Sequence, residues 1–257
     1  MGASPANNTN SGIIIMQIIK QSDLDFESVV VALKDGKTIV YPTETCYGLG
    51  CDARNGAAVE KIVKIKQRRE EKPFLVVVPD VAMAMEYLEW SPKLQELADK
   101  YWPGALTVVG RALSLRGPRH GGGRSNPVVK QHWIAALPRV ARNDSLADGV
   151  VAPDGTVALR VTAHPVAAAL ARALGRPLIS TSANISGKEP SYSAEEVIKM
   201  FVPMKYGIPH FVEKNQQPDQ PDILLDFGVL PQNPPTTIVR VVGDEMRVLR
   251  KGSVLVS

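Results

Sequence analysis

Two polar runs carry the residue types that could hold a polyphosphate. The first is Lys66-Gln67-Arg68 with Lys72 close behind it, and the second is Ser180-Thr181-Ser182-Ala183-Asn184. Neither run is needed to build a core, because Lys, Arg and Asn are seldom buried without partners. Polyphosphates bind cations and directional hydrogen-bond donors. Brought together on one face of the protein, the two runs would therefore form a polyphosphate site.

A third polar segment, residues 41–50, reads Tyr-Pro-Thr-Glu-Thr-Cys-Tyr-Gly-Leu-Gly. Its Thr-Glu-Thr run follows a short β-branched stretch, residues 38–41, which predicts a strand closed by Pro42. Hydroxyl groups at the carboxyl end of a strand lie where α/β sheets hold ligands. Taken alone, the segment is also typical of a capped turn that binds nothing.

The signatures of the common nucleotide-binding loops and nucleophilic enzymes are missing. The sequence has no Gly-x-x-x-x-Gly-Lys-Ser/Thr, no strand-linked Gly-x-Gly-x-x-Gly and no Gly-x-Ser-x-Gly. The four histidines show no metal-ligand spacing, and neither Ser180 nor Ser182 has an evident base. We therefore predict a site of cations, hydroxyls and main-chain donors, without a protein-held metal, that polarises its substrate rather than attacking it.

Composition favours a soluble cytoplasmic protein. The 257 residues are 44% apolar and 22% charged, which is ordinary for a globular chain. No run approaches the ~20 apolar residues of a membrane helix, and the first residues lack a secretory signal. Cys46 and Cys51 are too few for a disulfide framework, so we interpret them as free thiols in a reducing compartment. An organellar address stays open.

The net charge of +4 comes from one segment. Residues 110–142 hold seven basic and no acidic residues, so the rest of the chain has 23 basic residues against 26 acidic ones. The segment is rich in Gly and Pro, which predicts a long insertion loop over residues 110–150. Two interpretations stay open for it: attraction to RNA or another polyanion, and a solvated insertion without a role. The seven cations are Arg111, Arg116, Arg119, Arg124, Lys130, Arg139 and Arg142.

Helical and extended patterns alternate along the chain. Capping residues and 3.6-residue periodicity predict helices at 23–34 (capped by Ser22), 57–69, 92–101 (Ser91), 165–174 and from 194 (Ser193). Short apolar runs predict strands at 38–41, 74–78, 106–109, 156–161, 177–180, 222–225, 236–242 and 246–249. This alternation predicts one α/β domain over residues 13–257, with a twisted mixed sheet flanked by helices, after a disordered segment 1–12.

Taken together, these segments resemble the YrdC-type threonylcarbamoyl-adenylate synthases. The resemblance extends over nearly the whole chain outside the first ~12 residues and the basic insertion. Each motif alone is weak, but the ordered combination is specific. It consists of Tyr-Pro-Thr-Glu-Thr-x-Tyr-Gly-Leu-Gly (41–50), Lys-x-Arg with a following Pro (66–73), Trp-Pro-Gly-x-Leu-Thr (102–107), Leu-Arg-Val and His-Pro (159–165), Ser-x-Asn-x-Ser-Gly (182–187) and Leu-Arg-x-Gly (249–252).

The resemblance implies a YrdC-like fold and a nucleotidyltransferase reaction. L-threonine, bicarbonate and ATP would give threonylcarbamoyl-AMP and pyrophosphate, for N6-threonylcarbamoylation of adenosine 37 in tRNAs that read ANN codons. Mg²⁺ would accompany ATP, held by phosphates and water. The product would pass to the tRNA threonylcarbamoyl transferase, and the basic insertion could contact tRNA as a lid or arm. Because the chain ends at Ser257, we expect the short form without an extra C-terminal domain.

The family pattern also implies residue roles. Lys66 and Arg68 would be the catalytic clamp on the charge that develops at the phosphates. An arginine on the amino-acid side is reasonable, because a guanidinium binds a carboxylate bidentately. The implied ATP contacts are Arg68, Lys72, Thr156, Ser182, Asn184 and Arg250. The implied L-threonine contacts are Thr45, Arg160, Ser180 and Thr236.

Two departures and two alternatives accompany this assignment. Val77 stands where many members have His, and Thr236-Thr237 stands where Ser-Thr is usual. An RNA-binding module without catalysis is the first alternative, although an aromatic content of 5% offers few stacking side chains. The second is a carbamoyl-handling domain like that of hydrogenase-maturation proteins, whose acylphosphatase and zinc-finger regions are not encoded here.

Overall fold

The computed structural model describes residues 16–68, 73–113, 145–202, 204–205, 208–209 and 219–256. Four predictions therefore lie wholly or mainly outside the described residues: the disordered segment 1–12, Lys72, and both proposed roles of the basic insertion, of whose seven cations only Arg111 is described. The described part contains no helix that is long and apolar enough to cross a membrane.

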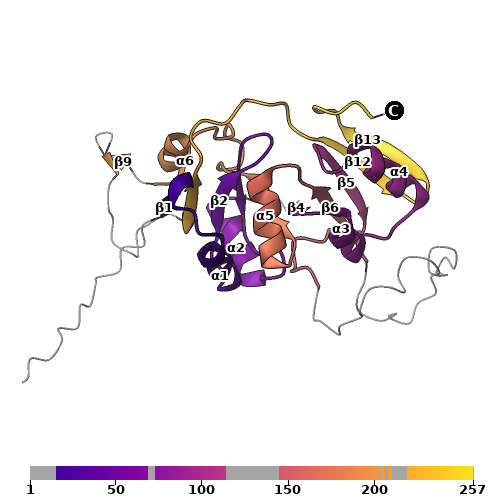
Figure 1. The fold of residues 1–257 in the computed structure, drawn as a ribbon, viewed down its shortest axis with the longest axis horizontal. Coiled ribbons are helices and arrows are strands. Elements are labelled where there is room, and N and C mark those ends of the chain that lie inside the picture. The colour runs from indigo at the N-terminus through magenta and orange to yellow at the C-terminus, as the bar shows by residue number, and fades with distance from the viewer. Residues whose placement is uncertain are drawn as a thin grey trace, which may run out of the picture.

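Two mixed sheets form the framework. Figure 1 shows the sheet of β1 and β2 on one side of α5 and the sheet of β5, β12 and β13 on the other. The five-stranded sheet has the order β1 (Gln17–Lys20), β11 (Ile223–Asp226), β2 (Ile39–Pro42), β3 (Tyr47–Gly50), β8 (Thr181–Ser182). The six-stranded sheet has the order β13 (Glu245–Arg250), β12 (Thr237–Val242), β5 (Leu106–Arg111), β6 (Thr156–Val161), β4 (Leu75–Val78), β7 (Leu178–Ile179). A small hairpin pairs β9 (Met204–Lys205) with β10 (Ile208–Pro209).

The predicted α/β fold with mixed pairing and flanking helices is confirmed, and its strands are divided between two sheets. Parallel pairs such as β4–β6 alternate with antiparallel pairs such as β2–β3 and the β12–β13 hairpin. The chain passes directly from β7 in one sheet to β8 in the other, with Ser180 between them. The second predicted polar run therefore lies at the junction of the two sheets.

Local capping signals fix most helix boundaries. α4 (Pro92–Tyr101) and α6 (Ala194–Phe201) begin after Ser91 and Ser193, whose hydroxyls accept main-chain N–H groups as predicted. α5 (Pro165–Leu174) ends at Gly175, whose φ of 66° is the left-handed conformation expected there. α3 (Val81–Tyr87), capped by Asp80, was not predicted.

The predicted start of the first helix is wrong. α1 spans Phe26–Lys34 and its N-cap is Asp25, which accepts the N–H groups of Glu27 and Ser28. The hydroxyl of Ser22 instead donates to the Asp23 carboxylate at 2.8 Å, inside a short 3₁₀ turn at Gln21–Asp23. A carboxylate with two acceptor oxygens caps two donors at once, which explains why the later residue is the cap.

The helix that carries the first polar run is shorter than predicted. α2 spans Gly56–Ile65, Lys66 is its C-cap, and Gln67 has a φ of 48°. This left-handed residue stops the helix, because a non-glycine residue with positive φ is a local turn and not a helical conformation. Arg68 thus lies beyond the helix rather than in its last turn. Val63, on the outer side of α2, is 37% exposed.

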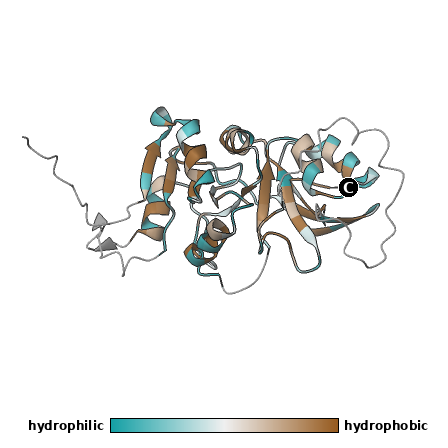
Figure 2. Ribbon diagram, turned by 90° about the horizontal axis from the view of Figure 1, so that it is seen from below, coloured by the Kyte–Doolittle hydropathy of each residue, from teal (hydrophilic) through white to brown (hydrophobic). Residues whose placement is uncertain are grey.

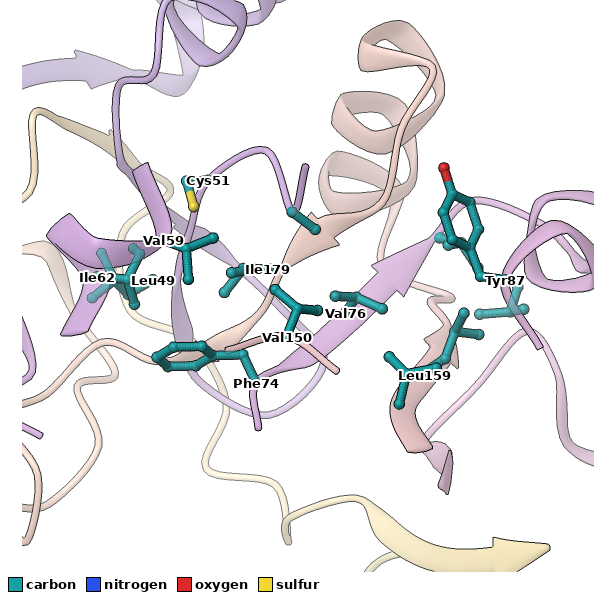
Figure 3. Packing of buried hydrophobic residues seen from close by; sticks show 14 of the residues in the cluster. Leu49, Cys51, Val59, Ile62, Phe74, Val76, Tyr87, Val150, Leu159 and Ile179 are labelled. Atoms are coloured by element: carbon teal, nitrogen blue, oxygen red, sulfur yellow. The ribbon is translucent and has the colours of Figure 1, made fainter. Parts of the chain in front are cut away.

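Apolar side chains pack on both faces of the sheets. The larger cluster joins α2, α3 and α4 to one face of the six-stranded sheet, and Figure 3 shows part of it around Phe74, Val76 and Leu159. A second cluster packs α1 and α5 against Val77 and Tyr41. Figure 2 shows strands that are largely hydrophobic and helices with hydrophilic outer turns. Cys46 and Cys51 are buried free thiols, as interpreted from the sequence.

Candidate functional site

Lys66 joins the two predicted polar runs directly. Lys66 is 5% exposed, and its ammonium donates to the carbonyl oxygens of Ser182 (2.7 Å) and Asn184 (3.0 Å) and to Asn184 Oδ1 (2.9 Å). The main-chain N–H of Ser186 donates to the Lys66 carbonyl at 2.9 Å. All three Nζ donors are therefore directed at the loop that follows β8. The predicted convergence of the two runs is found for Lys66, and its ammonium shapes the loop.

The side chain of Asn184 is held within the same network. Its Oδ1 accepts from Lys66 and from the Ser182 hydroxyl at 2.7 Å, and its Nδ2 donates to the Lys188 carbonyl. An amide with these three bonds has little capacity left for a ligand. Asn184 thus fixes the loop, and Ser182 beside it is half-buried.

Arg68 lies next to this loop and stacks on an aromatic ring. Its guanidinium carbon is 4.7 Å from the centre of the Phe74 ring, which orients the planar group. Burial, together with the nearby positive charge of Arg68, lowers the pKa of Lys66 to about 8, while Cys46 acts in the opposite direction. Two cations are therefore close together here, an arrangement that favours anion binding.

The Thr-Glu-Thr run forms a compact turn between β2 and β3. The Thr43 hydroxyl donates to the Cys46 carbonyl at 2.7 Å and accepts from the Thr45 and Cys46 N–H groups at 3.3 and 3.4 Å. Thr45 Oγ1 lies 3.4 Å from Thr43 Oγ1. The turn is capped internally, as one interpretation of the sequence proposed, and it still presents the half-buried Thr45 at the carboxyl end of β2.

Arg160 is buried on β6 beside this turn. Only 2% of it is exposed, and its Nη1 lies 2.9 Å from Glu44 Oε2. The alignment of this ion pair is poor for a hydrogen bond, and Nη1 and Nε have no hydrogen-bond partner among the described residues. Burial would raise the pKa of Glu44, but the Arg160 guanidinium and the donors around its carboxylate bring it below its ordinary value. A buried guanidinium with unused donors is suited to an anionic ligand.

Ser180 lies close to the same turn, across β3. A Cβ atom on Gly48 would lie 2.8 Å from Thr43 Cγ2, 3.5 Å from Tyr41 Cζ and 3.6 Å from Ser180 Oγ. The first of these distances is too short for a real Cβ atom, so glycine at position 48 gives Thr43 the room to pack here. The Tyr41 hydroxyl donates to the Ile179 carbonyl at 3.0 Å, and burial raises its pKa. Ser180 and Thr45 are thus brought to one small region, as predicted.

Thr236 and Arg250 form a pair of their own. Arg250 donates from Nε and Nη2 to the Thr236 carbonyl at 3.1 and 2.9 Å, and from Nη2 to the Thr236 hydroxyl at 3.2 Å. Thr236 Oγ1 is 3.2 Å from Thr107 Oγ1. One predicted ATP contact is thus bonded to one predicted threonine contact, which couples the two halves of the predicted site.

Strand register places these residues on one sheet face. Arg160, Ala158 and Thr156 alternate along β6, so they share a face, and the neighbouring Leu159 packs on the opposite one with α3 and α4. Pairing across β5 and β12 extends the Arg160 face to Thr107 and then to Arg250. Thr156 lies at the far end of β6, where its hydroxyl donates to Asp154 at 2.7 Å.

Cys46 lies where the Arg160 part and the Lys66 part of the predicted site approach each other. Burial raises the pKa of its thiol, while the Thr45 hydroxyl and the charges of Arg160 and Lys66 oppose that rise. Arg160 belongs to the six-stranded sheet and Lys66 to α2, so both cations act on a thiol in the turn between β2 and β3. A separate surface cavity of about 340 Å³, between Asp52, Arg54 and Arg176, includes none of the predicted site residues.

Comparison with known proteins identifies the family. A family profile for Sua5, YciO and YrdC proteins, described as "Telomere recombination", matches residues 31–126 and 122–252. The chain belongs to the Sua5/YciO/YrdC family. A threonylcarbamoyl-AMP synthase of Idiomarina loihiensis is 36% identical over 179 residues, which cover 68% of this chain and 80% of that relative.

Two solved structures show the shared family fold. E. coli YciO superposes with a TM-score of 0.63 at 25% identity, over 93% of this chain and 97% of that one. P. abyssi Sua5 in complex with L-threonine gives a TM-score of 0.67 at 24% identity over 93% of this chain, and this chain spans 57% of that Sua5 structure. The YrdC-like fold expected from the sequence motifs is thus confirmed.

Three residues of this family member belong to the site but were not predicted. Glu44 pairs with Arg160, Asp154 holds Thr156, and His164 lies beside Glu44 with a buried Nδ1 that has no hydrogen-bond partner in the described part of the chain. Burial lowers the pKa of His164. A signal for Glu44 was present in the sequence, because an arginine predicted inside a sheet needs a carboxylate nearby.

Proposed function

We propose that this protein is an L-threonylcarbamoyladenylate synthase. The amine of L-threonine would form a bond to the carbon of bicarbonate and water would leave. The resulting carbamate oxygen would then attack the α-phosphorus of ATP and displace pyrophosphate. Relatives named threonylcarbamoyl-AMP synthase, such as the one of Idiomarina loihiensis at 36% identity, support the proposal. So does a site that gathers cations and hydroxyls without a nucleophile, because such a site positions and polarises.

Arg160 carries the amino-acid half of the proposal. Nη1 of its buried guanidinium faces the Glu44 carboxylate at 2.9 Å, whereas Nε has no hydrogen-bond partner among the described residues. In this proposal the α-carboxylate of threonine accepts from Nε, because buried donors are rarely left unpaired in folded proteins. Thr45, Ser180 and Thr236 supply hydroxyls near it, and in this proposal they read the amino-acid substrate. Val77, opposite Arg160 in the β4–β6 ladder, is fully buried, so it contributes packing at this position.

The nucleotide half is assigned to the neighbouring loop. In this proposal Arg68 and Lys72 neutralise the phosphates, Ser182 lies beside them, and Thr156 and Arg250 contact the remainder of ATP. In this proposal Lys66 and Asn184 do not contact ATP but support the site, because their polar atoms hold the 182–188 loop in place. The division between contacting and supporting residues refines the predicted catalytic role of Lys66.

Mg²⁺ would enter with ATP in this proposal. Phosphate oxygens and water would hold the cation, which would neutralise charge on the departing pyrophosphate. Within the described residues there is no group of three or more His, Cys, Asp or Glu suited to a metal ion. The product would pass to the tRNA threonylcarbamoyl transferase, and the basic insertion at 110–142 would be the tRNA-facing segment.

One assay tests the proposed function. The protein is incubated with ATP, Mg²⁺, bicarbonate and L-threonine, and we expect pyrophosphate and a threonylcarbamoyl adenylate that depend on all three substrates. Arg68→Ala should abolish both products, whereas Arg172→Ala, an exposed arginine on α5, should leave them unchanged. Pyrophosphate release that does not require threonine would contradict the proposal. Salt-sensitive tRNA binding without ATP turnover would favour the RNA-binding alternative instead.

A further inference from the structure

Glu44 lies between the two sheets and bonds to both sides. Its Oε1 accepts from the Thr162 hydroxyl (2.7 Å), the Ala163 N–H (2.8 Å) and the His164 N–H (3.3 Å). These three donors belong to the turn between β6 and α5. Glu44 itself lies in the turn between β2 and β3, in the other sheet. The carboxylate therefore spans the junction at which the proposed threonine contacts meet.

The other carboxylate oxygen neutralises Arg160. Oε2 is 2.9 Å from Arg160 Nη1, and it is buried without any hydrogen bond in the described structure. A buried guanidinium without a counter-charge is costly, so Glu44 holds Arg160 in place by charge and leaves its Nε free. The geometry is that of a side chain that orients a neighbour.

A third segment is fastened to the main chain of Glu44. The Asn233 side chain donates to the Glu44 carbonyl at 2.8 Å. Asn233 lies in the connection between β11 of the five-stranded sheet and β12 of the six-stranded sheet, three residues before Thr236. Glu44 is thus bonded to the segments that carry Thr45, Arg160 and Thr236.

We propose that Glu44 is a positioning residue for the amino-acid substrate. It sets the orientation of the Arg160 guanidinium and the spacing between Arg160 and the Thr45 hydroxyl, which belong to different sheets. The inference rests on the proposed threonine site. Glu44 acts through Arg160 and the turns, because Oε1 already accepts three hydrogen bonds and Oε2 faces the guanidinium.

Glu44→Gln separates this role from a purely structural one. Glutamine keeps one acceptor for the Thr162–His164 turn and removes the charge that orients Arg160. We expect the KM for L-threonine to rise roughly tenfold to a hundredfold, as for other buried charge pairs that lose one partner. The KM for ATP should change by less than about twofold, because no ATP contact depends on Glu44.

Asp52→Asn is the matched control. Asp52 is also a buried carboxylate, 1% exposed, that pairs with an arginine (Arg176, 2.7 Å) and accepts a main-chain N–H (Arg54, 2.9 Å). Because it lies outside the proposed site, its variant should lose stability as Glu44→Gln does while keeping the wild-type KM for threonine. Glu44→Asp keeps the charge and should recover part of the threonine affinity. It is the second test variant if Glu44→Gln folds poorly.

The outcomes separate the two proposals. If the wild-type protein is active and Glu44→Gln has the same KM for threonine as the wild type, the positioning role alone is overturned. Equal rises in both KM values, or the same kinetic change in Asp52→Asn, also overturn it, because they indicate general loss of structure. A wild-type protein without threonine-dependent pyrophosphate release overturns the proposed function and the Glu44 inference together.

Discussion

Lys66 and Asn184 are joined by two hydrogen bonds across 118 residues of sequence. The Lys66 ammonium lies 2.9 Å from Asn184 Oδ1 and 3.0 Å from the Asn184 carbonyl oxygen. The pair fastens the end of α2 to the loop after β8. The position of the loop that we propose for phosphate binding thus depends on a buried cation that is itself fully hydrogen-bonded.

Replacing Lys66 should damage the loop as well as the activity. Lys66→Ala removes three hydrogen bonds and leaves buried acceptors unpaired, so we expect the free energy of unfolding to fall by about 2–4 kcal/mol. The KM for ATP should rise, because the loop loses its anchor. Denaturant unfolding and steady-state kinetics measure the two effects. Lys64→Ala, two residues earlier and exposed, is the control and should change neither.

The lowered pKa of Lys66 predicts an alkaline limb in the activity. Burial places this pKa at about 8, with Arg68 contributing and Cys46 opposing. Above that pH the amine lacks one donor for its three acceptors, so kcat/KM for ATP should fall as pH rises through about 8. A pH profile of Lys66→Arg should lack this limb, since a guanidinium keeps its proton. An identical alkaline limb in both proteins would assign the ionisation to another group.

The lowered pKa of Lys66 affects stability in the direction opposite to its effect on activity, because the free energy of unfolding should rise with pH. The folded pKa of about 8 lies below the ordinary lysine value of 10.5. Between those values the unfolded chain binds the proton more tightly, so the contribution of Lys66 to the free energy of unfolding rises with pH across this window. Below about pH 8 both states are protonated and the contribution is constant. Urea titrations of wild type and Lys66→Met at pH 7, 8 and 9.5 would check the sign.

Three glycines offer a graded test of packing at the amino-acid half. A Cβ on Gly48 would press on Thr43 at 2.8 Å, a Cβ on Gly50 would lie 2.1 Å from the Ile179 carbonyl oxygen, and a Cβ on Gly56 would meet nothing within 4 Å. We expect Gly50→Ala to cost about 3 kcal/mol or more and Gly48→Ala roughly 1–3 kcal/mol. Gly56→Ala should be close to neutral.

Kinetics distinguish the two crowded positions. Gly48→Ala displaces Thr43, whose hydroxyl organises the turn that carries Thr45. The KM for threonine should therefore rise more in this variant than in Gly50→Ala, relative to the stability that each variant loses. Thermal unfolding and threonine KM are measured on the same preparations. A Gly48→Ala protein with wild-type threonine KM would show that the turn tolerates displacement of Thr43.

Local signals in the sequence predicted much of the fold, and long-range pairing explains what they missed. Pro165 and Gly175 bound α5 because each acts through its own backbone conformation. The left-handed Gln67 that ends α2 has no such signature in its residue type, so the helix was predicted too long. The division of the strands between two sheets depends on contacts between distant segments, such as β3 with β8.

The same distinction applies to the site. The residue types of the two polar runs suggested that Lys66, Ser182 and Asn184 belong together, and the structure joins them. They did not show which of these groups the protein itself already uses as hydrogen-bond partners. The partner of Arg160 was overlooked for the same reason, since Glu44 lies 116 positions earlier and in another sheet.

Arg250 should affect both substrates, because it is bonded to Thr236. Arg250→Ala removes three hydrogen bonds to Thr236 and a cation from the sheet face that also carries Arg160. We expect the KM values for ATP and for threonine to rise together, by roughly tenfold each. Arg247→Ala, an exposed arginine on the same strand, is the control for loss of charge alone. If Arg250→Ala raised only the KM for ATP, the Thr236 bond would have no part in threonine binding, and the coupling between the two halves would have to pass through Lys66 and Cys46.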